Sequence, residues 1–148
     1  MAARQDLTLQ RHNGGVTFYE EIGGYETLQT IVHRFYEGVA TDEVLRPLYP
    51  EEDLGPAEER FLLFLVQYWG GPTTYSDTRG HPRLRMRHAP FAVTPDAAQH
   101  WLSCFRAALD EADLTPEQDQ QFWDYVTHAA QFMVNTLEEP DEVPRPAR

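Results

Sequence analysis

The residues best suited to chemistry lie in one stretch, Gly80 to Phe91, which carries two histidines and a run of arginines. Neutral imidazole is the commonest metal ligand in proteins, so one of these histidines is a candidate for binding a metal ion. The neighbouring guanidinium groups would attract an anion, and they belong to Arg79, Arg83, Arg85 and Arg87. Apolar, aromatic-rich segments flank the stretch, Phe61 to Trp69 before it and the segment of Trp101 after it. We interpret the stretch as a place where an imidazole meets a metal between two apolar walls.

A haem would satisfy both requirements, because it offers an iron to an imidazole and two propionates to arginines. His88 is the candidate ligand, since its short segment lies between two prolines and buries little by itself. Phenol and indole groups at Tyr36, Tyr49 and Trp101 occupy apolar faces where Phe or Leu would pack as well. A buried O–H or N–H needs a hydrogen-bond partner. Three such donors converging on one pocket would suit a polar ligand with partial negative charge, such as bound dioxygen.

Other interpretations of these residues remain open. Aromatic residues at helical spacing usually form an ordinary core, scattered histidines usually lie at the surface, and an arginine cluster is usually a solvated face. A zinc site could use His81 and His88, but Pro82 disfavours a helix that holds both, and neither HExxH nor CxxC occurs. A hydrolase active site is an even weaker interpretation, because the lone Cys104 lies within an expected helix and no strand is expected to carry a nucleophile elbow.

The composition favours one domain and disfavours several partners. The chain has 148 residues, 41% of them hydrophobic, and a formal net charge of −12. Such a charge repels phosphate backbones and anionic membrane surfaces, so neither nucleic acid nor a membrane is an expected partner. Cys104 is the single cysteine, so it cannot form an internal disulfide. No stretch resembles a signal peptide or a spanning helix, and we expect a cytoplasmic protein.

Hydrophobic periodicity predicts an all-α protein of six or seven helices. Apolar residues recur on one helical face from Tyr25 to Ala40. Capping signals start helices at Thr17, at Thr94-Pro95 and at Thr115-Pro116, and Gly70-Gly71 ends the helix that carries Phe61.

The segments between and beyond these helices set the domain boundaries. Residues 72–80 are polar and are expected to form a loop. We expect a flexible N-terminal extension at 1–16, one folded domain at 17–137, and a flexible C-terminal tail, rich in Pro and acidic residues, at 138–148.

Five groups of residues resemble a known family. They are Phe18-Tyr19-Glu20-Glu21-Ile22-Gly23-Gly24, Arg34-Phe35-Tyr36, Tyr68-Trp69-Gly70-Gly71-Pro72, the run from His81 to Phe91, and Trp101. In this order they are similar to the truncated haemoglobins, most of all to the group II (O-type) subfamily of actinobacteria. The resemblance covers about residues 17–137, which would then form a truncated globin domain. It implies a two-over-two helical sandwich around haem b.

The resemblance also implies a role for particular residues. His88 matches the proximal iron ligand, and the distal donors would be Tyr36, Tyr49 and Trp101. Phe61, Phe64 and Leu65 match the distal helix face over the porphyrin. The propionate partners would be Arg60 and Arg87, and Phe91 is expected beside the cofactor. Ala57 stands where many globins carry a distal His or Gln, so ligand stabilisation would fall on the two tyrosines and the tryptophan.

The implied function is reversible binding of dioxygen, and of carbon monoxide and nitric oxide, at the iron held by His88. Several donors predict slow oxygen release, which suits retention or redox chemistry better than bulk transport. A redox enzyme that uses the haem, by nitric oxide detoxification or peroxidase-like activity, is an alternative and would need a reductase partner. A haem-free interaction module is a second alternative. A homodimer is left open, because nothing in the sequence identifies its interface.

Overall fold

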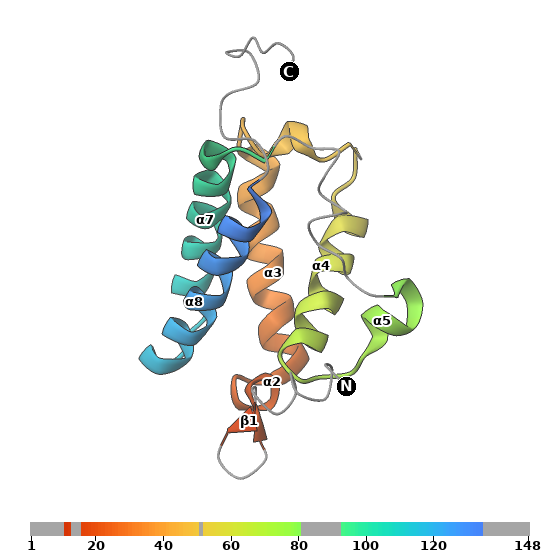
Figure 1. Cartoon of the computed structure of the whole chain (residues 1–148), viewed down its shortest axis with the longest axis vertical. Coiled ribbons are helices and arrows are strands. Elements are labelled where there is room, and N and C mark those ends of the chain that lie inside the picture. Colours follow the sequence, from red (N-terminus) through yellow and green to blue (C-terminus); the bar gives the residue numbers. More distant parts are fainter. Residues whose placement is uncertain (1–10, 13–15, 51, 81–92, 135–148) are drawn as a thin grey trace.

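The computed structural model describes residues 11–12, 16–50, 52–80 and 93–134, and for Arg11 and His12 it describes the backbone only. A small antiparallel hairpin comes first and the helices follow (Figure 1). In chain order the elements are β1 (Arg11–His12), β2 (Val16–Thr17), α2 (Phe18–Glu21), α3 (Gly24–Thr41), the 3-10 helix η1 (Arg46–Leu48), α4 (Gly55–Tyr68), α5 (Thr74–Arg79), α7 (Pro95–Asp110) and α8 (Pro116–Met133).

Helix α3 is the central element of the fold. It packs against α4 on one side and α7 on the other, and α8 packs on α7 (Figure 1). The pairs α3–α4 and α7–α8 therefore form two layers, so the all-α class follows the sequence pattern and the sandwich is the one that the resemblance implies. The predicted apolar face of α3 is confirmed, because the buried residues of this helix are Leu28, Ile31, Val32, Phe35, Tyr36 and Val39.

Three threonines begin helices by hydrogen-bonding the first turn, and all three caps were expected. Thr17 and Glu20 form a reciprocal capping box, with the Glu20 N–H 3.1 Å from the Thr17 hydroxyl. Thr115 and Gln118 form a second one, also at 3.1 Å. The buried Thr94 hydroxyl accepts from the Ala97 N–H at 3.0 Å. Such caps satisfy N–H groups that have no partner within the helix.

The prediction of a loop over residues 72–80 is wrong, because α5 occupies Thr74–Arg79. Local propensity is weak here, since threonine and serine are poor helix formers. Tertiary contacts stabilise the helix instead. The Gln67 amide of α4 accepts from the Ser76 N–H at 2.9 Å and donates to the Ser76 hydroxyl at 2.7 Å. The Tyr75 ring is buried, edge-on to the ring of Phe64. The β1–β2 pairing was not predicted either, since no alternation of apolar and polar residues marks it.

Glycines permit two close approaches in this fold. A Cβ built on Gly38 of α3 would lie 2.9 Å from the Cys104 Sγ of α7. The two helices can therefore approach closely at this point because Gly38 has no side chain. A Cβ on Gly70 would lie 2.7 Å from Cβ of Thr17, which joins the end of α4 to the start of α2. Within the described residues, none of the helices combines the length and the apolar character that a membrane crossing requires.

Replacing Gly70 tests the second approach. Gly70 and Gly80 both have positive φ, +103° and +81°, but no described atom lies within 4 Å of the position of a Cβ on Gly80. Gly80→Ala is therefore the matched control, with backbone strain of about 1–3 kcal/mol and no overlap with a described atom. We expect Gly70→Ala to lower the free energy of unfolding by about 1–3 kcal/mol more than the control, because overlap with Thr17 adds to the strain. Urea denaturation of both variants measures the difference, and equal losses would contradict the steric argument.

Candidate functional site

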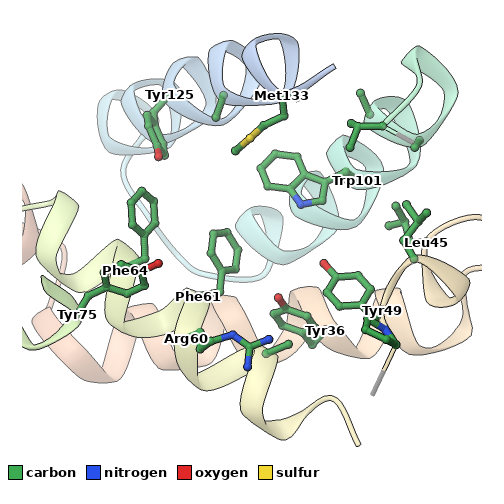
Figure 2. A pocket seen from close by; sticks show the side chains of 18 of the residues that line it. Tyr36, Leu45, Tyr49, Arg60, Phe61, Phe64, Tyr75, Trp101, Tyr125 and Met133 are labelled. Atoms are coloured by element: carbon green, nitrogen blue, oxygen red, sulfur yellow. The ribbon is translucent and has the colours of Figure 1, made fainter. Parts of the chain in front are cut away.

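A cavity of about 530 Å³ lies between the two helical layers (Figure 2). Helices α3 and α4 form one side of it, and α7 and α8 form the other (Figure 2). Its size falls in the range of small-molecule and cofactor sites. Most of its lining is apolar, with a few polar side chains among aromatic rings. The lining residues are Tyr36, Leu45, Leu48, Tyr49, Pro50, Ala57, Arg60, Phe61, Phe64, Tyr75, Arg79, Val93, Ala97, Ala98, Trp101, Tyr125, Ala129, Ala130 and Met133.

The three predicted hydrogen-bond donors come together in this cavity from three different elements. Tyr36 lies on α3, Tyr49 follows η1, and Trp101 lies on α7. The rings of Tyr36 and Tyr49 are edge-on, with centroids 5.8 Å apart. Figure 2 shows these two rings side by side, with the Trp101 indole facing them from the opposite layer. The cavity therefore presents two phenols and one indole in a common space.

The Tyr36 phenol is held in its neutral form. Burial raises its pKa well above the usual value, and the nearby Tyr49, which hydrogen-bonds it, raises the pKa further. Arg60 opposes this rise through its positive charge. A neutral phenol has one O–H to donate, whereas a phenolate has none. Tyr36 therefore remains a hydrogen-bond donor throughout the neutral pH range.

Aromatic rings from α4 form the apolar wall beside these donors. Phe61 lies 6.2 Å from Tyr36 and 6.3 Å from Trp101, measured between ring centroids. Phe64 lies further along the same wall. The third predicted residue of this helix face, Leu65, is absent from the lining and is fully buried in the core. Ala57 lines the cavity and is buried, so no His or Gln side chain stands at that position.

Two arginines line the cavity, Arg60 from within α4 and Arg79 from the end of α5. Arg60 on α4 was predicted, and Figure 2 shows it below the ring of Phe61. Arg79 at the end of α5 was recognised only as one of several clustered basic residues, and its guanidinium also lies 5.9 Å from the ring centroid of Tyr75. Two guanidinium groups beside an apolar cavity suit a flat apolar ligand with anionic groups.

Several lining residues had no assigned role in the sequence analysis. Tyr125 and Met133 come from α8 and close the far side of the cavity (Figure 2). Met133 lies within the helix that Thr115-Pro116 was expected to start, and apolar periodicity along that helix is the signal that could have placed it. The Tyr125 ring stacks on Tyr68 at 4.1 Å between centroids, and burial raises the pKa of its phenol. Nothing in the sequence distinguishes Tyr125 from an ordinary core aromatic residue.

The stretch that first suggested a metal ligand, residues 81–92, lies outside the described residues. His88, Arg87 and Phe91 therefore keep their predicted roles as expectations. The described chain reaches the cavity on both sides of this stretch, because Arg79 precedes it, Val93 follows it, and both line the cavity.

The described residues fit a haem. The cavity has apolar, aromatic walls from both layers, which suit the faces of a porphyrin. Arg60 and Arg79 supply positive charge of the kind that carboxylates recognise. The neutral donors face a common space from both layers, where a small polar ligand would need them. Fold and cavity together define a protein of the globin class, with two helices packed over two.

Comparisons with known proteins give the same class. The chain matches the family described as bacterial-like globin over residues 17–135. The group 2 truncated haemoglobin YjbI of Bacillus subtilis is 41% identical over 123 residues, which are 83% of this chain and 92% of that protein. The crystal structure of a thermostable haemoglobin from the actinobacterium Thermobifida fusca is 58% identical with a TM-score of 0.82, covering 83% of this chain and all of that one. A truncated oxygen-avid haemoglobin from B. subtilis has a TM-score of 0.75 at 41% identity, covering 80% and 98%.

The chain belongs to the bacterial-like globin family, and its close relatives include group II truncated haemoglobins. The predicted two-over-two fold, the haem b cofactor and reversible haem-based binding of oxygen are those of this family and are confirmed at that level.

The raised pKa of Tyr36 predicts how stability depends on alkaline pH. The folded state holds the Tyr36 proton more tightly than the unfolded state does, so this stabilisation is complete below pH 10 and is lost as pH rises further. Above pH 10 we expect the unfolding free energy of the wild type to fall faster than that of Tyr36→Phe, by up to about 1.4 kcal/mol per pH unit.

Urea denaturation between pH 9 and pH 11 measures the two slopes. Phe35→Leu is the control, because Phe35 packs edge-on to Tyr36 and has no proton to release. It should lower stability at every pH and leave the slope unchanged. Equal slopes for wild type and Tyr36→Phe would contradict the prediction.

Proposed function

We propose that this globin retains dioxygen tightly, and that Tyr36, Tyr49 and Trp101 slow its release. The observation that supports the proposal is the convergence of these three side chains in one apolar cavity. When bound, haem b supplies an iron at which dioxygen and other diatomic ligands, such as carbon monoxide and nitric oxide, coordinate reversibly. In this proposal His88 holds that iron. The oxygen-avid relative from B. subtilis supports the slow release.

The three donors would act by stabilising partial negative charge on the ligand. A hydrogen bond to a charged group contributes about 1.5–3 kcal/mol, which slows release roughly tenfold to hundredfold for each bond. The apolar surroundings strengthen each bond, because little water competes in a low-dielectric cavity. Tyr36 keeps its proton, so it can donate at any neutral pH. Trp101 has only a donor, so its indole cannot accept a bond in place of the ligand.

The remaining predicted residues would hold the cofactor itself. Phe61, Phe64 and Phe91 would pack on the macrocycle, with Leu65 supporting this wall from the core behind it. Arg60 and Arg87 would pair with the propionates. Arg79 joins them in this proposal, because it lines the same cavity from α5.

Retention suits a cytoplasmic role in oxygen binding or redox chemistry better than bulk delivery. A single cysteine, Cys104, supports an intracellular location, since no internal disulfide is possible. In this proposal the globin domain spans residues 17–137. Turnover of nitric oxide or peroxide would need a reductase partner. A homodimer would need an interface between two copies of the chain, and size-exclusion chromatography of the purified protein measures its oligomeric state.

The first experiment is an absorption spectrum of the purified protein, oxidised, reduced and under carbon monoxide, for wild type and His88→Gly. A Soret band that shifts with carbon monoxide shows bound haem. In His88→Gly the band should change and be restored by added imidazole, which identifies His88 as the ligand. An unchanged spectrum in this variant would assign the iron to another residue. Sustained turnover of nitric oxide with a reductant would favour the redox alternative.

Replacing Trp101 tests the proposed hydrogen-bond network. Trp101→Phe removes an N–H and keeps a ring, so we expect oxygen release to accelerate about tenfold to hundredfold. Stopped-flow displacement of oxygen measures the rate. Trp123→Phe is the matched control, because Trp123 lies outside the cavity on α8, 4.7 Å from the Arg106 guanidinium. An unchanged rate in Trp101→Phe would remove this indole from the network.

A further inference from the structure

Asp42 links the end of α3, the turn that follows it and helix α7. It follows the last residue of α3, and its own N–H donates to the Val39 carbonyl at 3.1 Å. Its carboxylate accepts the N–H groups of Val44 and Leu45, both at 2.9 Å. Its carbonyl accepts the Arg46 N–H at 2.9 Å. One residue therefore ends α3 and sets the direction of the chain that follows.

His100 of α7 binds the same carboxylate. Its Nδ1 lies 3.0 Å from Oδ1 and 2.9 Å from Oδ2 of Asp42, across 58 positions of sequence. An ionised carboxylate only accepts hydrogen bonds, so Nδ1 carries the proton in this contact. The Asp42 side chain is 16% exposed and that of His100 is 35% exposed, so water reaches the histidine more readily than the carboxylate.

The turn that Asp42 organises carries part of the cavity wall. Leu45, Leu48 and Tyr49 all line the cavity from this turn. Arg46 fixes the end of it, because its guanidinium donates to the carbonyls of Tyr49 at 3.1 Å and Glu52 at 2.8 Å. On the other side of the contact, His100 directly precedes Trp101 on α7.

We propose that Asp42 and His100 are positioning residues for the ligand pocket, because their hydrogen-bonded pair fixes the 42–49 turn against α7 and thereby places the Tyr49 hydroxyl opposite Trp101. The proposal rests on the function proposed above, in which these two side chains bind the ligand. Neither Asp42 nor His100 lines the cavity, so both act through the residues they position.

The pair responds to pH. Three carboxylates face His100: Asp42 from the end of α3, Glu43 from the turn and Asp96 from α7 itself, 3.7 Å from Nε2. The hydrogen bond with Asp42 raises the pKa of His100 above its usual value, against the effect of burial. The Cys104 thiol also senses Asp42: burial and the charge of Asp42 raise its pKa, and the charge of Arg34 opposes the rise.

The sign of the pH effect follows from these contacts. Below pH 6.5 His100 is charged and its bond to Asp42 is charge-assisted. As pH rises through the raised pKa of His100 the charge is lost, although a neutral Nδ1–H still donates. The turn is therefore held most firmly at low pH, and we expect oxygen release to accelerate as pH rises from 6 to 9. Asp42 stays ionised over this whole range, because bonds from His100, Leu45 and Val44 lower its pKa against the effect of burial.

A second histidine–carboxylate pair provides a matched control. His33 of α3 lies 3.0 Å from Glu58 of α4 through its Nδ1 and 3.4 Å from Glu37 through its Nε2. It has the same chemistry and also joins α3 to a neighbouring helix. It has no contact with the 42–49 turn among the interactions of the described residues, so its loss should leave the position of Tyr49 unchanged.

The first test is a double-mutant cycle on oxygen release. We expect Asp42→Ala to accelerate release by about three- to tenfold, which is less than the effect of Tyr49→Phe. In a Tyr49→Phe background, Asp42→Ala should change the rate by less than about twofold, because the group that it positions is already gone. An Asp42→Ala rate equal to wild type, or the same acceleration in both backgrounds, would overturn the proposal. Asp42→Asn keeps an acceptor for the turn, so it tests the proposal if the alanine variant folds poorly.

The second test is rescue at position 100. His100→Asn keeps a donor near the position of Nδ1 without a titratable charge, whereas His100→Leu keeps neither. We expect His100→Asn to release oxygen within about twofold of wild type at pH 8 and to lose the pH dependence between 6 and 9, and His100→Leu to resemble Asp42→Ala. His33→Asn should keep the wild-type pH profile. A pH profile that survives in His100→Asn would overturn the proposal.

An independent readout separates this proposal from the proposed function. In the reduced protein under carbon monoxide, an NMR titration gives the pKa of the His100 ring, which should fall in Asp42→Asn. The Tyr49 ring signals should shift with the same midpoint as His100 in wild type. If Trp101→Phe and Tyr49→Phe leave oxygen release unchanged, the function proposal fails. If they accelerate release but the Tyr49 ring signals do not shift with the titration of His100, only the positioning proposal fails.

Discussion

Helix α3 contacts both neighbouring helices through one apolar face, and the cavity exists because that face is shared. Its buried residues pack on α4 and α7 at once, so these helices cannot separate without exposing the apolar face of α3. Phe35 shows the arrangement at the level of single rings, since it lies 5.7 Å from Phe61 of α4 and 5.6 Å from Trp101 of α7. Tyr36, the next residue, turns from this core into the cavity. The donor is thus positioned by the same helix that joins the two layers.

Two kinds of polar side chain line the cavity, neutral hydrogen-bond donors and positively charged arginines. Neutral donors lie on α3, on the turn after it and on α7, while the described positive charges lie on α4 and at the end of α5. The separation is partial, because the positive charge of Arg60 still lowers the pKa of Tyr36 against the effect of burial. A small polar ligand and the anionic edge of a cofactor can therefore be recognised in the same cavity by different groups.

Much of this arrangement could be predicted from local sequence patterns, and the remainder depends on contacts between distant residues. The face of α3 and the threonine caps follow from periodicity and from hydrogen bonds over three residues, so they were recognisable. Helix α5 depends on the bonds between Gln67 and Ser76, which propensity does not reveal. Leu65 shares a helix with Phe61 but faces the core, because α4 contacts both the core and the cavity and periodicity cannot distinguish the two. The pairing of Asp42 with His100 leaves no local signal, and the neighbours of Tyr125 become apparent only in three dimensions.

The contact between Gly38 and Cys104 has a consequence for how this sequence can change over evolutionary time. A methyl group at position 38 would meet the Cys104 sulfur at 2.9 Å, and both atoms belong to the interface between α3 and α7. Enlarging either residue alone would push apart the helices that carry Tyr36 and Trp101. The residues at the two positions should therefore change together, with a smaller side chain at position 104 arising before any larger one at position 38. Such an order of substitutions would appear as covariation between two sites that touch no ligand, and its origin would be the spacing of the helices.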